Sequence, residues 1–319
     1  QDMALIVQKF GGSSVKDRDR IFNVARIVAN THNAGNDVVV VVSAQGDTTD
    51  DLIAKAGEIT HNPSAREMDM LLASGEQISI SLLAMALNEL GCHAISLTGW
   101  QAGFRTDRAY TKARITRLET ERISSELERN RVVVVAGFQG LNKMDDITTL
   151  GRGGSDTSAV AVAAALGAPC DIYTDVDGVY TTDPRIESRA RRLNKVSYEE
   201  MLEMASLGAK VLQTRSVELA MRYKVRLRVL SSFEDTDETS GTLVCDEDEI
   251  MESKVVNGVA YSREEAKITL VTVEDRPGIS AAIFAPLADA GVNVDMIVQN
   301  ISERDYEDHL GAVTDMTFS

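Results

Sequence analysis

A glycine-rich stretch in the middle of the chain has the residue types of a ligand-binding loop. It reads Gly151-Arg152-Gly153-Gly154-Ser155-Asp156 and leads into an alanine-rich segment that is expected to be helical over 159–166. Glycine lets the backbone approach a ligand that a Cβ would keep away, and the amides at a helix N-terminus favour an anion. Arg152 can hold a carboxylate with two parallel hydrogen bonds, and Asp156 can meet an ammonium group or a metal. The stretch therefore predicts a loop with partners for both ends of an amino acid.

An ordinary glycine turn that caps a core helix would use the same residues. In either interpretation Ser155 or Asp156 can serve as the helix N-cap. The loop alone does not decide between the two interpretations, so the other polar turns of the chain have to be weighed with it.

A second candidate lies near the start of the chain, where Lys9-Phe10-Gly11-Gly12-Ser13-Ser14 follows an apolar strand expected over 3–7. Its backbone amides can form a concave phosphate-binding turn, with Lys9 as a positive point charge. A solvated lysine at a strand end is the alternative. The chain has neither the phosphate-loop pattern G-x-x-x-x-G-K-[ST] nor a G-x-G-x-x-G turn after a strand, which argues against two common nucleotide folds.

Three further polar segments could contribute to a site. The loop Ser43-Ala44-Gln45-Gly46-Asp47-Thr48-Thr49 is rich in hydroxyl groups, although by itself it fits a simple turn. In Ser74-Gly75-Glu76-Gln77, Ser74 is predicted to cap a helix with Gln77 as its capping-box partner, and Glu76 could face the sheet rim. The loop after Tyr173 alternates aspartate and glycine as calcium loops do, but Ile186 stands where the closing glutamate is needed. A loop that binds an adenine nucleotide fits as well.

Strands that alternate with helices predict the scaffold for these turns. Apolar strands are expected over 3–7, 37–43, 94–97, 131–136 and 171–174, and two of them are valine runs typical of parallel strands buried on both faces. Two helices are expected before the third strand, the second with an apolar face of Ile78, Leu82 and Met85 and its end at Gly91. This order predicts an α/β fold, a three-layer αβα sandwich that binds ligands beyond the carboxyl ends of its strands.

Length, charge and cysteine usage exclude several classes of protein. The 319 residues suggest two domains, and a net charge of −16 disfavours nucleic acid and anionic membranes as partners. No apolar run approaches the roughly 20 residues of a membrane span, and no signal peptide is evident. Three scattered cysteines and four scattered histidines argue against a zinc site or a disulfide framework and for a cytoplasmic location. We expect no metal ligands from the protein itself.

The composition changes near residue 232, where acidic, turn-rich segments begin. The expected division is a first domain over 3–232, a linker and lead-in over 233–266, and a second domain over 267–319. The elements predicted in the second domain are a strand over 267–273, a helix over 279–290 kinked at Pro286, and strands over 292–298 and 312–318. This β-α-β-β order is three quarters of a ferredoxin-like unit, whose closing helix and strand are expected to lie outside this sequence.

Seven motifs, taken in order, resemble those of the bacterial aspartate kinases of the amino-acid-kinase superfamily. They are Val7-Gln8-Lys9-Phe10-Gly11-Gly12-Ser13-Ser14-Val15, Ser74-Gly75-Glu76-Gln77, Thr98-Gly99-Trp100-Gln101-Ala102-Gly103, Gly137-Phe138-Gln139-Gly140, Gly151-Arg152-Gly153-Gly154-Ser155-Asp156, Thr174-Asp175-Val176-Asp177-Gly178 and Gly208-Ala209-Lys210-Val211-Leu212. The resemblance covers 3–319. It implies phosphorylation of the β-carboxylate of L-aspartate by ATP, with Mg²⁺ held mainly by the nucleotide. The implied product is 4-phospho-L-aspartate, on the route to lysine, threonine, methionine and diaminopimelate.

The resemblance also implies a role for each candidate residue. Lys9 would neutralise charge on the transferring phosphoryl group, and Asp156 would orient the reacting groups, so these two are the implied catalytic residues. Glu76 would take the α-ammonium of aspartate and Arg152 its carboxylate end. The implied aspartate site consists of Ser43, Thr49, Glu76, Arg152 and Ser155. The implied nucleotide site consists of Lys9, Phe10, Gly11, Gly12, Ser13, Thr174, Asp175, Tyr180, Arg185 and Lys210. A carboxylate nucleophile is already ionised at pH 7, so no general base is required.

The C-terminal segment resembles an ACT domain, the amino-acid sensor of this family. The motifs that carry this resemblance are Asp275-Arg276-Pro277-Gly278 and Asn293-Val294-Asp295-Met296-Ile297-Val298-Gln299-Asn300. The implied site for an inhibitory lysine or threonine consists of Asp275, Gly278, Ser280, Asp295 and Gln299. Such a site needs a second ACT unit, often from a partner subunit, so a homodimer or higher oligomer is expected. A plain dimerisation domain is the alternative.

Two other functions stay open. One is a kinase of the same fold that acts on glutamate or acetylglutamate, against which the ACT pattern and Thr98-Gly99-Trp100-Gln101 argue. The other is a regulatory amino-acid-binding module with an inactive kinase site. Against it stand four charged residues, since an inactive site would not need Lys9, Glu76, Arg152 and Asp156.

Overall fold

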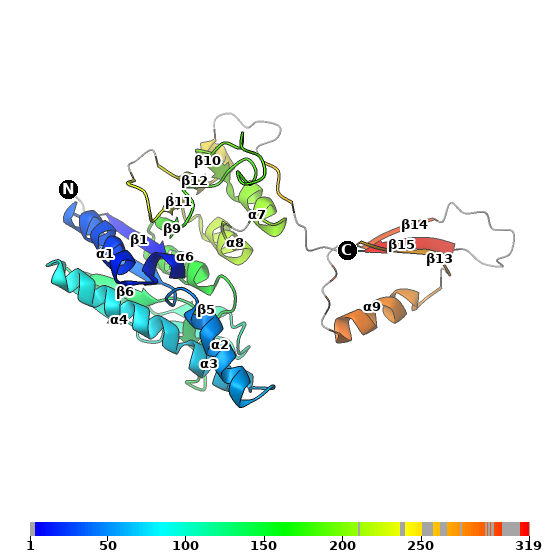
Figure 1. The fold of residues 1–319 in the computed structure, drawn as a ribbon, viewed down its shortest axis with the longest axis horizontal. Helices are drawn as coiled ribbons and strands as arrows, with labels where there is room; N and C mark the ends of the chain where they lie inside the picture. Colours follow the sequence, from blue (N-terminus) through cyan, green and yellow to red (C-terminus); the bar gives the residue numbers. More distant parts are fainter. Residues whose placement is uncertain are drawn as a thin grey trace. The chain divides into compact units, whose positions relative to one another are not determined.

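The computed structural model describes residues 4–209, 211–236, 240–250, 258–261, 267–274, 276–290, 292, 294, 297–301 and 313–318 (Figure 1). The chain forms two compact units, Gln1–Tyr261 and Ser262–Ser319. The larger unit contains all the candidate residues for catalysis and aspartate binding, so it is described first.

An eight-stranded sheet forms the centre of the larger unit. Its strands, in order across the sheet, are β10 (Lys195–Ser197), β12 (Thr242–Cys245), β11 (Leu227–Ser231), β9 (Cys170–Thr174), β1 (Leu5–Phe10), β2 (Asp37–Val42), β6 (Val132–Ala136) and β3 (Ala94–Leu97). Neighbouring strands are parallel except for β11 and β12. The central strands β2 and β6 are runs of valine because both of their faces are buried, as the sequence predicted.

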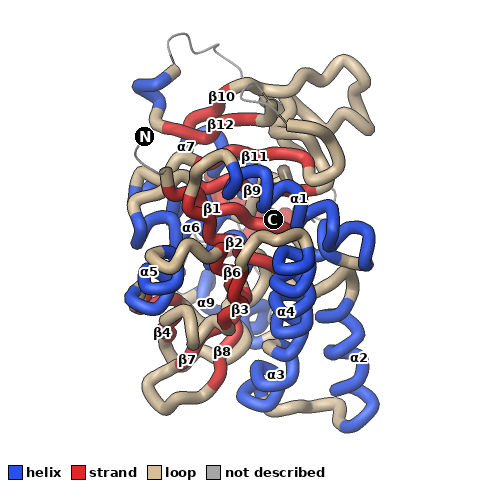
Figure 2. Tube along the Cα trace, turned by 90° about the vertical axis from the view of Figure 1, so that its left-hand side faces the viewer, coloured by secondary structure: helices blue, strands red, loops and turns tan. Residues whose placement is uncertain are grey.

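Helices cover both faces of this sheet and form the predicted three-layer sandwich (Figure 2). Side chains alternate along β2, so that Val39 and Val41 pack with one set of helices and Val38 and Val40 with the other. One face is covered by α1 (Arg18–Asn33) and α4 (Ser74–Glu89). The opposite face is covered by α5 (Glu121–Leu127), α6 (Gly154–Leu166), α7 (Tyr198–Ser206) and α8 (Thr214–Tyr223).

A smaller sheet and two helices adjoin this sandwich. The strand order of the smaller sheet is β5 (Ile115–Leu118), β4 (Phe104–Thr106), β7 (Gln139–Leu141) and β8 (Ile147–Thr149). The helices are α2 (Thr48–Ile59) and α3 (Ala65–Leu72), and α3 packs against β8. Because β7 follows β6 almost directly, the smaller sheet adjoins the carboxyl end of this central strand.

The prediction for the helices that precede β3 was wrong in two respects. Three helices, α2 to α4, occupy this segment where two were expected. Ile78, Leu82 and Met85 form the exposed side of α4, whereas its buried side includes Ile80 and Leu83. Both sides of α4 are apolar, so hydrophobic spacing could not identify the buried one.

The start of α4 also differs from the prediction, while its end agrees. Ser74 is the first residue of α4 and not its N-cap, and its hydroxyl donates to the carbonyl of Leu71 at 2.7 Å. A single residue, Ala73, separates α3 from α4, so α4 takes over from a preceding helix and needs no capping box. At the other end, Gly91 follows the helix with a φ of 76°, as expected of a terminating glycine.

Together α3 and α4 form a stretch long and apolar enough to cross a membrane. This stretch, Ala65–Glu89, has 25 residues, and an 18-residue window within it has a mean hydropathy of 1.5 and is 56% buried inside the protein. It was missed in the sequence because Ser74, Glu76 and Gln77 interrupt its apolar residues. α4 packs against α1, β3 and β6, which is the packing of a core helix.

One strand of the large sheet comes from the segment predicted to be a linker. β12 lies within 233–266 and pairs with β10 and β11. Acidic residues precede and follow its four residues, and they concealed a short apolar strand. This part of the segment therefore belongs to the larger unit.

The described residues of the smaller unit form a three-stranded sheet and one helix. Its elements are β13 (Ile268–Glu274), α9 (Ile279–Asp289), β14 (Ile297–Ile301) and β15 (Val313–Phe318), in the predicted β-α-β-β order. β15 lies between β13 and β14 and pairs antiparallel with both. The strand expected over 292–298 was placed too early, since β14 begins at Ile297. α9 continues past Pro286, and Phe284 packs against Phe318 with ring centroids 5.1 Å apart.

Candidate active site

Four parallel strands end side by side at one edge of the large sheet, and the candidate residues gather there. These strands are β9, β1, β2 and β6. In the register of the sheet, Lys9 near the end of β1 lies opposite Val41 of β2 and Ile172 of β9. These strand ends are followed directly by the turn Gly11-Gly12-Ser13 (the glycine turn), the loop over 43–49 (the hydroxyl loop), Gly137 and the loop from Thr174. The structure therefore brings the predicted turns together at the carboxyl edge, where open α/β sheets bind ligands.

An ion pair joins β1 to α6 at this edge. The Nζ atom of Lys9 lies 2.6 Å from Oδ1 of Asp156, and the two side chains are 12% and 9% exposed. Lys9 shares the α6 side of the sheet with Val7, whereas the ring of Phe10 lies on the other side and stacks on Tyr173. Lys9 is therefore held in one orientation with its ammonium at the rim. The side chain of Phe10 is part of the core, so a ligand at the rim could meet the backbone of this residue but not its ring.

α6 begins with a turn built on glycine. Its N-cap is Gly153, whose φ of 68° lies in the left-handed region, and no described side chain caps the helix. Ser155 and Asp156 lie inside the first turn, so the prediction that one of them is the N-cap was wrong. Glycine adopts the required backbone conformation without a side-chain cap. The amide of Gly154 donates to the carbonyl of Gly151 at 3.1 Å, so among the described contacts the amides of Ser155 and Asp156 are left for a ligand.

Arg152 and Ser155 lie on either side of this turn. Arg152 is exposed, and within the described part of the chain its guanidinium makes no ion pair or hydrogen bond. Ser155 is 8% exposed and packs against Gly137, where a Cβ would come within 2.7 Å of the Ser155 hydroxyl. A glycine at 137 thus lets the start of α6 approach the end of β6. Gly137 stood in a motif of the sequence, but nothing in the sequence indicated this contact.

Glu76 brings a buried carboxylate to the same edge from the first turn of α4. Its side chain is 2% exposed, and Oε1 accepts a hydrogen bond of 3.2 Å from the amide of Ala44. The other oxygen, Oε2, has no hydrogen-bond partner among the described residues. Burial raises the pKa of Glu76 to about 8. A buried carboxylate with one unoccupied oxygen is suited to bind a cationic group such as an ammonium.

The glycine turn packs against the hydroxyl loop. The amide of Gly46 donates to the carbonyl of Gly12 at 3.0 Å, and a Cβ at Gly12 would lie 2.6 Å from the carbonyl oxygen of Ala44. Gly11 adjoins the ammonium of Lys9, since a Cβ at Gly11 would lie 3.5 Å from Nζ. Ser13 is exposed. A larger side chain at Gly11 would therefore fill the space beside Lys9, and one at Gly12 would clash with the backbone of Ala44 and Gly46.

Ser43 and Thr49 lie on the β2 side of this turn. The amide of Ser43 donates to the carbonyl of Phe10 at 3.2 Å, which extends the pairing of β1 with β2 by one residue. Thr49 is half-buried in the first turn of α2. Both are thus near the end of β2, but no described contact joins their hydroxyl groups to Glu76 or Arg152.

The remaining nucleotide candidates lie on the loop after β9. The hydroxyl of Thr174 donates to Oδ1 of Asp175 at 2.9 Å, and that of Tyr180 donates to Oδ1 of Asp177 at 2.9 Å. Arg185 is exposed and pairs with Asp183, which raises the pKa of its guanidinium, with a smaller contribution from Asp175. Because β9 pairs with β1, the start of this loop lies next to the glycine turn.

Some predicted site residues lie outside the described part of the chain, and others lie in the smaller unit. The predicted residues outside the described part are Lys210, Asp275 and Asp295. In the smaller unit, Gly278 is the N-cap of α9 with a φ of 92°, Ser280 lies in its first turn and Gln299 lies on β14. All three are exposed.

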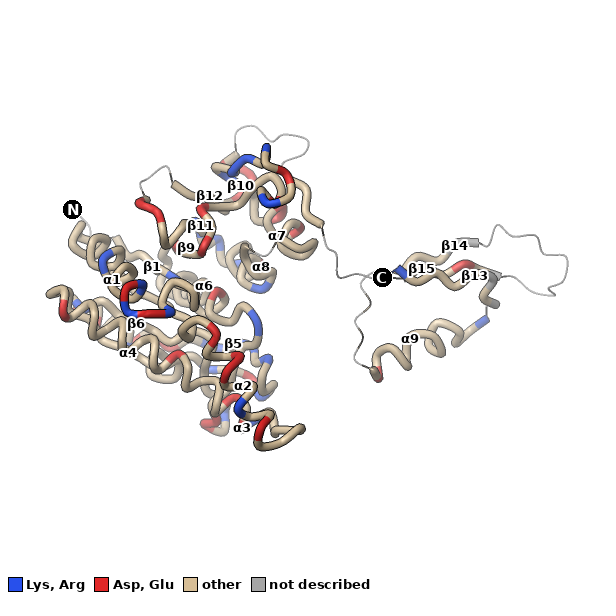
Figure 3. Tube along the Cα trace, viewed as in Figure 1, with Lys and Arg blue, Asp and Glu red and all other residues tan. Residues whose placement is uncertain are grey.

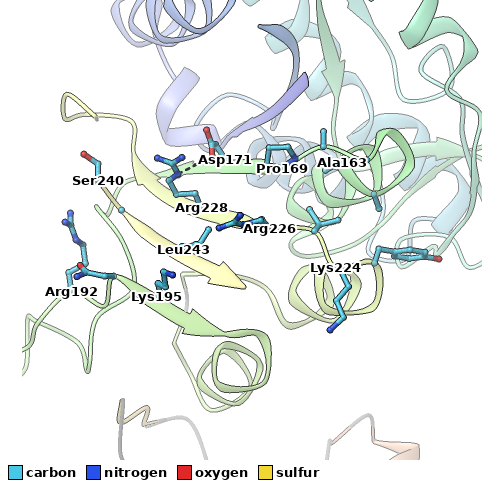
Figure 4. Close-up of a pocket in the computed structure, with 17 residues that line it drawn as sticks. Ala163, Pro169, Asp171, Arg192, Lys195, Lys224, Arg226, Arg228, Ser240 and Leu243 are labelled. Carbon is cyan, nitrogen blue, oxygen red and sulfur yellow. Dashed lines mark ion pairs between the residues drawn. The ribbon is translucent and has the colours of Figure 1, made fainter. Parts of the chain in front are cut away.

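A pocket of about 1080 Å³ lies elsewhere, at the amino ends of β9 and β11 (Figure 4). Five cationic side chains line it, and each has a described partner: Arg192 with Asp177, Lys195 with the carbonyl of Glu249, Lys224 with Asp246, Arg226 with Glu249, and Arg228 with Asp171. Acidic and basic residues are accordingly interspersed around β10 and β12 (Figure 3). None of the candidate catalytic or aspartate-binding residues lines this pocket, so it is not the candidate active site.

Family models match both units of the chain. Residues 4–231 match the amino acid kinase family, and residues 267–318 match the ACT domain. An aspartate kinase of Stutzerimonas stutzeri is 53% identical over an alignment of 319 positions that covers 99% of this chain and 75% of that protein.

Two solved structures of E. coli aspartokinase III are similar over 99% of this chain. The complex with aspartate and ADP has a TM-score of 0.77 and 27% identity, and this chain covers 78% of it. The complex with lysine and aspartate has a TM-score of 0.72 and 26% identity, with 79% covered. Both matches extend over the kinase unit and the ACT domain of this chain.

Proposed function

Since the chain belongs to the amino acid kinase family, and within it to the aspartate kinases, we propose that it transfers the γ-phosphoryl group of ATP to the β-carboxylate of L-aspartate. The products are 4-phospho-L-aspartate and ADP. The observation that supports this most is the ion pair of Lys9 with Asp156, because it holds an ammonium group between the glycine turn and the start of α6.

The proposed chemistry needs positioning and charge neutralisation more than proton transfer. The β-carboxylate is already ionised at neutral pH, so it can attack phosphorus without a general base. Negative charge on the transferring phosphoryl group has to be neutralised, and a lysine held by a second charged group does so without reorganising. Lys9 has this arrangement, since Asp156 fixes its ammonium at 2.6 Å. Asp156 in turn keeps its carboxylate at the start of α6.

The proposed aspartate site has a cation-binding side and an anion-binding side. Glu76, whose Oε2 has no described partner, takes the α-ammonium group. Arg152 and the first turn of α6, with Ser155, take the α-carboxylate. Ser43 and Thr49 contribute from the end of β2 and the start of α2. The β-carboxylate then points towards Lys9.

The proposed nucleotide site lies between the glycine turn and the loop after β9. Gly11, Gly12 and Ser13 line the phosphates, with the backbone of Phe10 behind them. The residues proposed around the rest of the nucleotide are Thr174, Asp175, Tyr180, Arg185 and Lys210. Mg²⁺ is expected to arrive on the phosphates of ATP and to neutralise part of their charge.

We also propose that the ACT domain binds an inhibitory amino acid, lysine or threonine, through Asp275, Gly278, Ser280, Asp295 and Gln299. The solved complex of a relative with lysine supports this class of effector. A homodimer or higher oligomer, a cytoplasmic location and a role at the start of lysine, threonine, methionine and diaminopimelate synthesis belong to the same proposal.

The test is ADP release by the whole chain with Mg·ATP and a panel of L-aspartate, L-glutamate and N-acetylglutamate. Turnover with aspartate that lysine or threonine suppresses would support both parts of the proposal. Turnover that neither suppresses would support the kinase and contradict the effector site. A preference for L-glutamate or N-acetylglutamate over aspartate, or no turnover with any of the three, would contradict the proposed substrate.

Arg152→Ala is expected to raise the KM for aspartate about 10- to 100-fold while the KM for ATP changes by less than about twofold. The guanidinium is exposed and without described partners, so its removal leaves no buried charge unpaired and should not destabilise the fold. The expected loss corresponds to one charge-assisted hydrogen-bond pair, about 1.5–3 kcal/mol. Initial rates at varied aspartate and varied ATP measure it. An unchanged KM for aspartate would contradict the proposed carboxylate contact.

A further inference from the structure

A buried carboxylate outside the predicted site joins α3 to the strand that precedes Arg152. Asp69 of α3 is fully buried. Its oxygens accept from the amide of Thr111 at 2.9 and 3.0 Å, from the amide of Thr149 at 3.0 Å and from the hydroxyl of Thr149 at 2.6 Å. Three donors thus converge on one carboxylate that contacts no predicted ligand.

On one side, this network fixes the backbone that carries Arg152. Thr149 ends β8, three residues before Arg152. Thr111 has a φ of 65°, and its carbonyl oxygen lies 3.0 Å from the position of a Cβ at Gly151. The loop between β8 and α6 therefore rests on the segment that Asp69 holds.

A second clamp fixes the same loop from α8. The guanidinium of Arg215 donates to the carbonyls of Leu150 at 2.9 Å and Ala113 at 2.8 Å. The backbone at Thr149 and at Leu150 is thus held, while the side chain of Arg152 has no described contact.

On the other side, Asp69 is linked to Glu76. α3 ends at Leu72 and α4 starts at Ser74, so only Ala73 separates the two helices. The carbonyl of Ala73 accepts a hydrogen bond of 2.8 Å from the side chain of Gln139 on β7. Asp69 and Glu76 therefore belong to one nearly continuous helical segment that is fastened to the smaller sheet.

We infer that Asp69 is a positioning residue for the aspartate site and that it sets the spacing between Glu76 and Arg152. The inference rests on the proposed function, in which these two residues hold the α-ammonium and the α-carboxylate of the substrate. Asp69 contacts neither group. It connects the helix that carries one to the loop that carries the other.

The inference predicts a defect in aspartate binding when the network is weakened. Asp69→Asn keeps the shape but replaces one carboxylate oxygen with an amide N–H₂, which cannot accept a hydrogen bond. The remaining oxygen must then take both backbone amides, and the Thr149 hydroxyl must turn to accept instead of donate. Loss of the negative charge weakens the bonds that remain. A shift of about 1 Å in a positioning contact can cost about 100-fold in rate. We expect the KM for aspartate to rise at least about tenfold and the KM for ATP to change by less than about twofold.

The chain-length selectivity of the site gives a readout that a loss of stability would not change. A methylene group typically changes kcat/KM by about 10- to 200-fold. If Asp69 fixes the groups that hold the α-carbon substituents of the substrate, Asp69→Asn should hold them less firmly. The ratio of kcat/KM for aspartate to kcat/KM for glutamate should then fall severalfold. Rates are measured at a temperature where circular dichroism shows the variant folded.

Two further variants control the experiment. Thr149→Val removes one hydroxyl donor to Asp69 with little change in volume. It should show the same selective rise in the KM for aspartate, about threefold. It replaces Asp69→Asn as the test variant if Asp69→Asn does not fold. Glu126→Gln alters another buried carboxylate, 1% exposed and paired with Arg122 and Arg131 at the amino end of β6, away from the site. It should leave both KM values unchanged.

The outcomes separate this inference from the proposed function. A selective rise in the KM for aspartate in Asp69→Asn and Thr149→Val, absent in Glu126→Gln, would support the inference. An active wild-type chain whose variants keep the wild-type KM for aspartate, or lose ATP and aspartate binding equally, would overturn the inference alone. A wild-type chain that does not phosphorylate aspartate would overturn the proposed function and the inference with it.

Discussion

Lys9→Met is expected to lower kcat about 1000-fold or more while the KM for aspartate changes little. Lys9 holds its ammonium beside the glycine turn at the end of β1, where charge develops on the transferring phosphoryl group. Removing one preorganised donor from such a position typically costs about 100- to 1000-fold in kcat, or about 2.7–4 kcal/mol. Because Lys9 carries a full positive charge, the loss in kcat should lie at the upper end of this range. Saturating ADP-release kinetics measure the loss.

The variant has a second effect that must be separated from the first. Lys9 and Asp156 are 12% and 9% exposed, so removing Lys9 leaves a mostly buried carboxylate without its counter-charge. Breaking such a pair typically costs about 3–5 kcal/mol of stability. Urea unfolding of Lys9→Met should therefore show a lower midpoint than the wild-type chain.

The double variant Lys9→Met with Asp156→Asn distinguishes catalysis from stability. It removes both charges, so it should regain much of the unfolding free energy lost in Lys9→Met, since the unpaired carboxylate is gone. Its kcat should remain as low as that of the single variant. Near-normal turnover of Lys9→Met, or recovery of turnover in the double variant, would count against the role of Lys9.

The sequence predicted the scaffold well wherever hydrophobic pattern decides the structure. The valine runs of β2 and β6 have only one favourable environment, a central position with both faces covered. Once these strands are parallel, their carboxyl ends share one edge, so Lys9, the hydroxyl loop and Gly137 had to lie near one another. The resemblance to aspartate kinases is confirmed by the relatives, whereas the roles of the individual site residues stay predictions.

The sequence failed where long-range contacts decide the structure. The exposed side of α4 carries Ile78 and Leu82, so apolar spacing alone selected the wrong face. β12 is only four residues long, and its pairing with β11 and β10 stabilises it more than its own composition does. Asp69 gave no signal, because a lone aspartate in a helix is most often solvated. Its importance comes from backbone amides 42 and 80 residues further along the chain.

Glu76→Gln is expected to make the stability of the ligand-free protein less dependent on pH. Burial raises the pKa of Glu76 to about 8 from an ordinary value of 4.5. Between these two values the folded protein binds a proton that the unfolded chain has lost, so stability falls as pH rises from about 4.5 through 8. At about 1.4 kcal/mol per pKa unit, the loss is on the order of 5 kcal/mol. Urea unfolding of the wild-type chain at pH 5 and pH 8.5 should show this loss, and in Glu76→Gln the loss should be much smaller.

The same carboxyl should make aspartate binding depend on pH in the opposite direction. An ammonium group binds the ionised form of Glu76, and with a pKa of about 8 only about a tenth of the ligand-free protein has this form at pH 7. The KM for aspartate should therefore fall as pH rises from 6 to 8, by up to about tenfold per pH unit at the lower end, while the KM for ATP should not follow.

In Glu76→Gln the KM for aspartate should be at least about 30-fold higher and independent of pH over the same range. Loss of one partner of a buried charge pair typically costs about 2–5 kcal/mol of binding, and a neutral amide has no proton to release. Glu126→Gln, which alters a buried carboxylate away from the site, should keep the wild-type pH profile. A wild-type KM for aspartate that is flat between pH 6 and 8, or a normal KM in Glu76→Gln, would show that the ammonium group binds elsewhere. Oε2 of Glu76, which has no hydrogen-bond partner among the described residues, would then need an explanation other than the substrate.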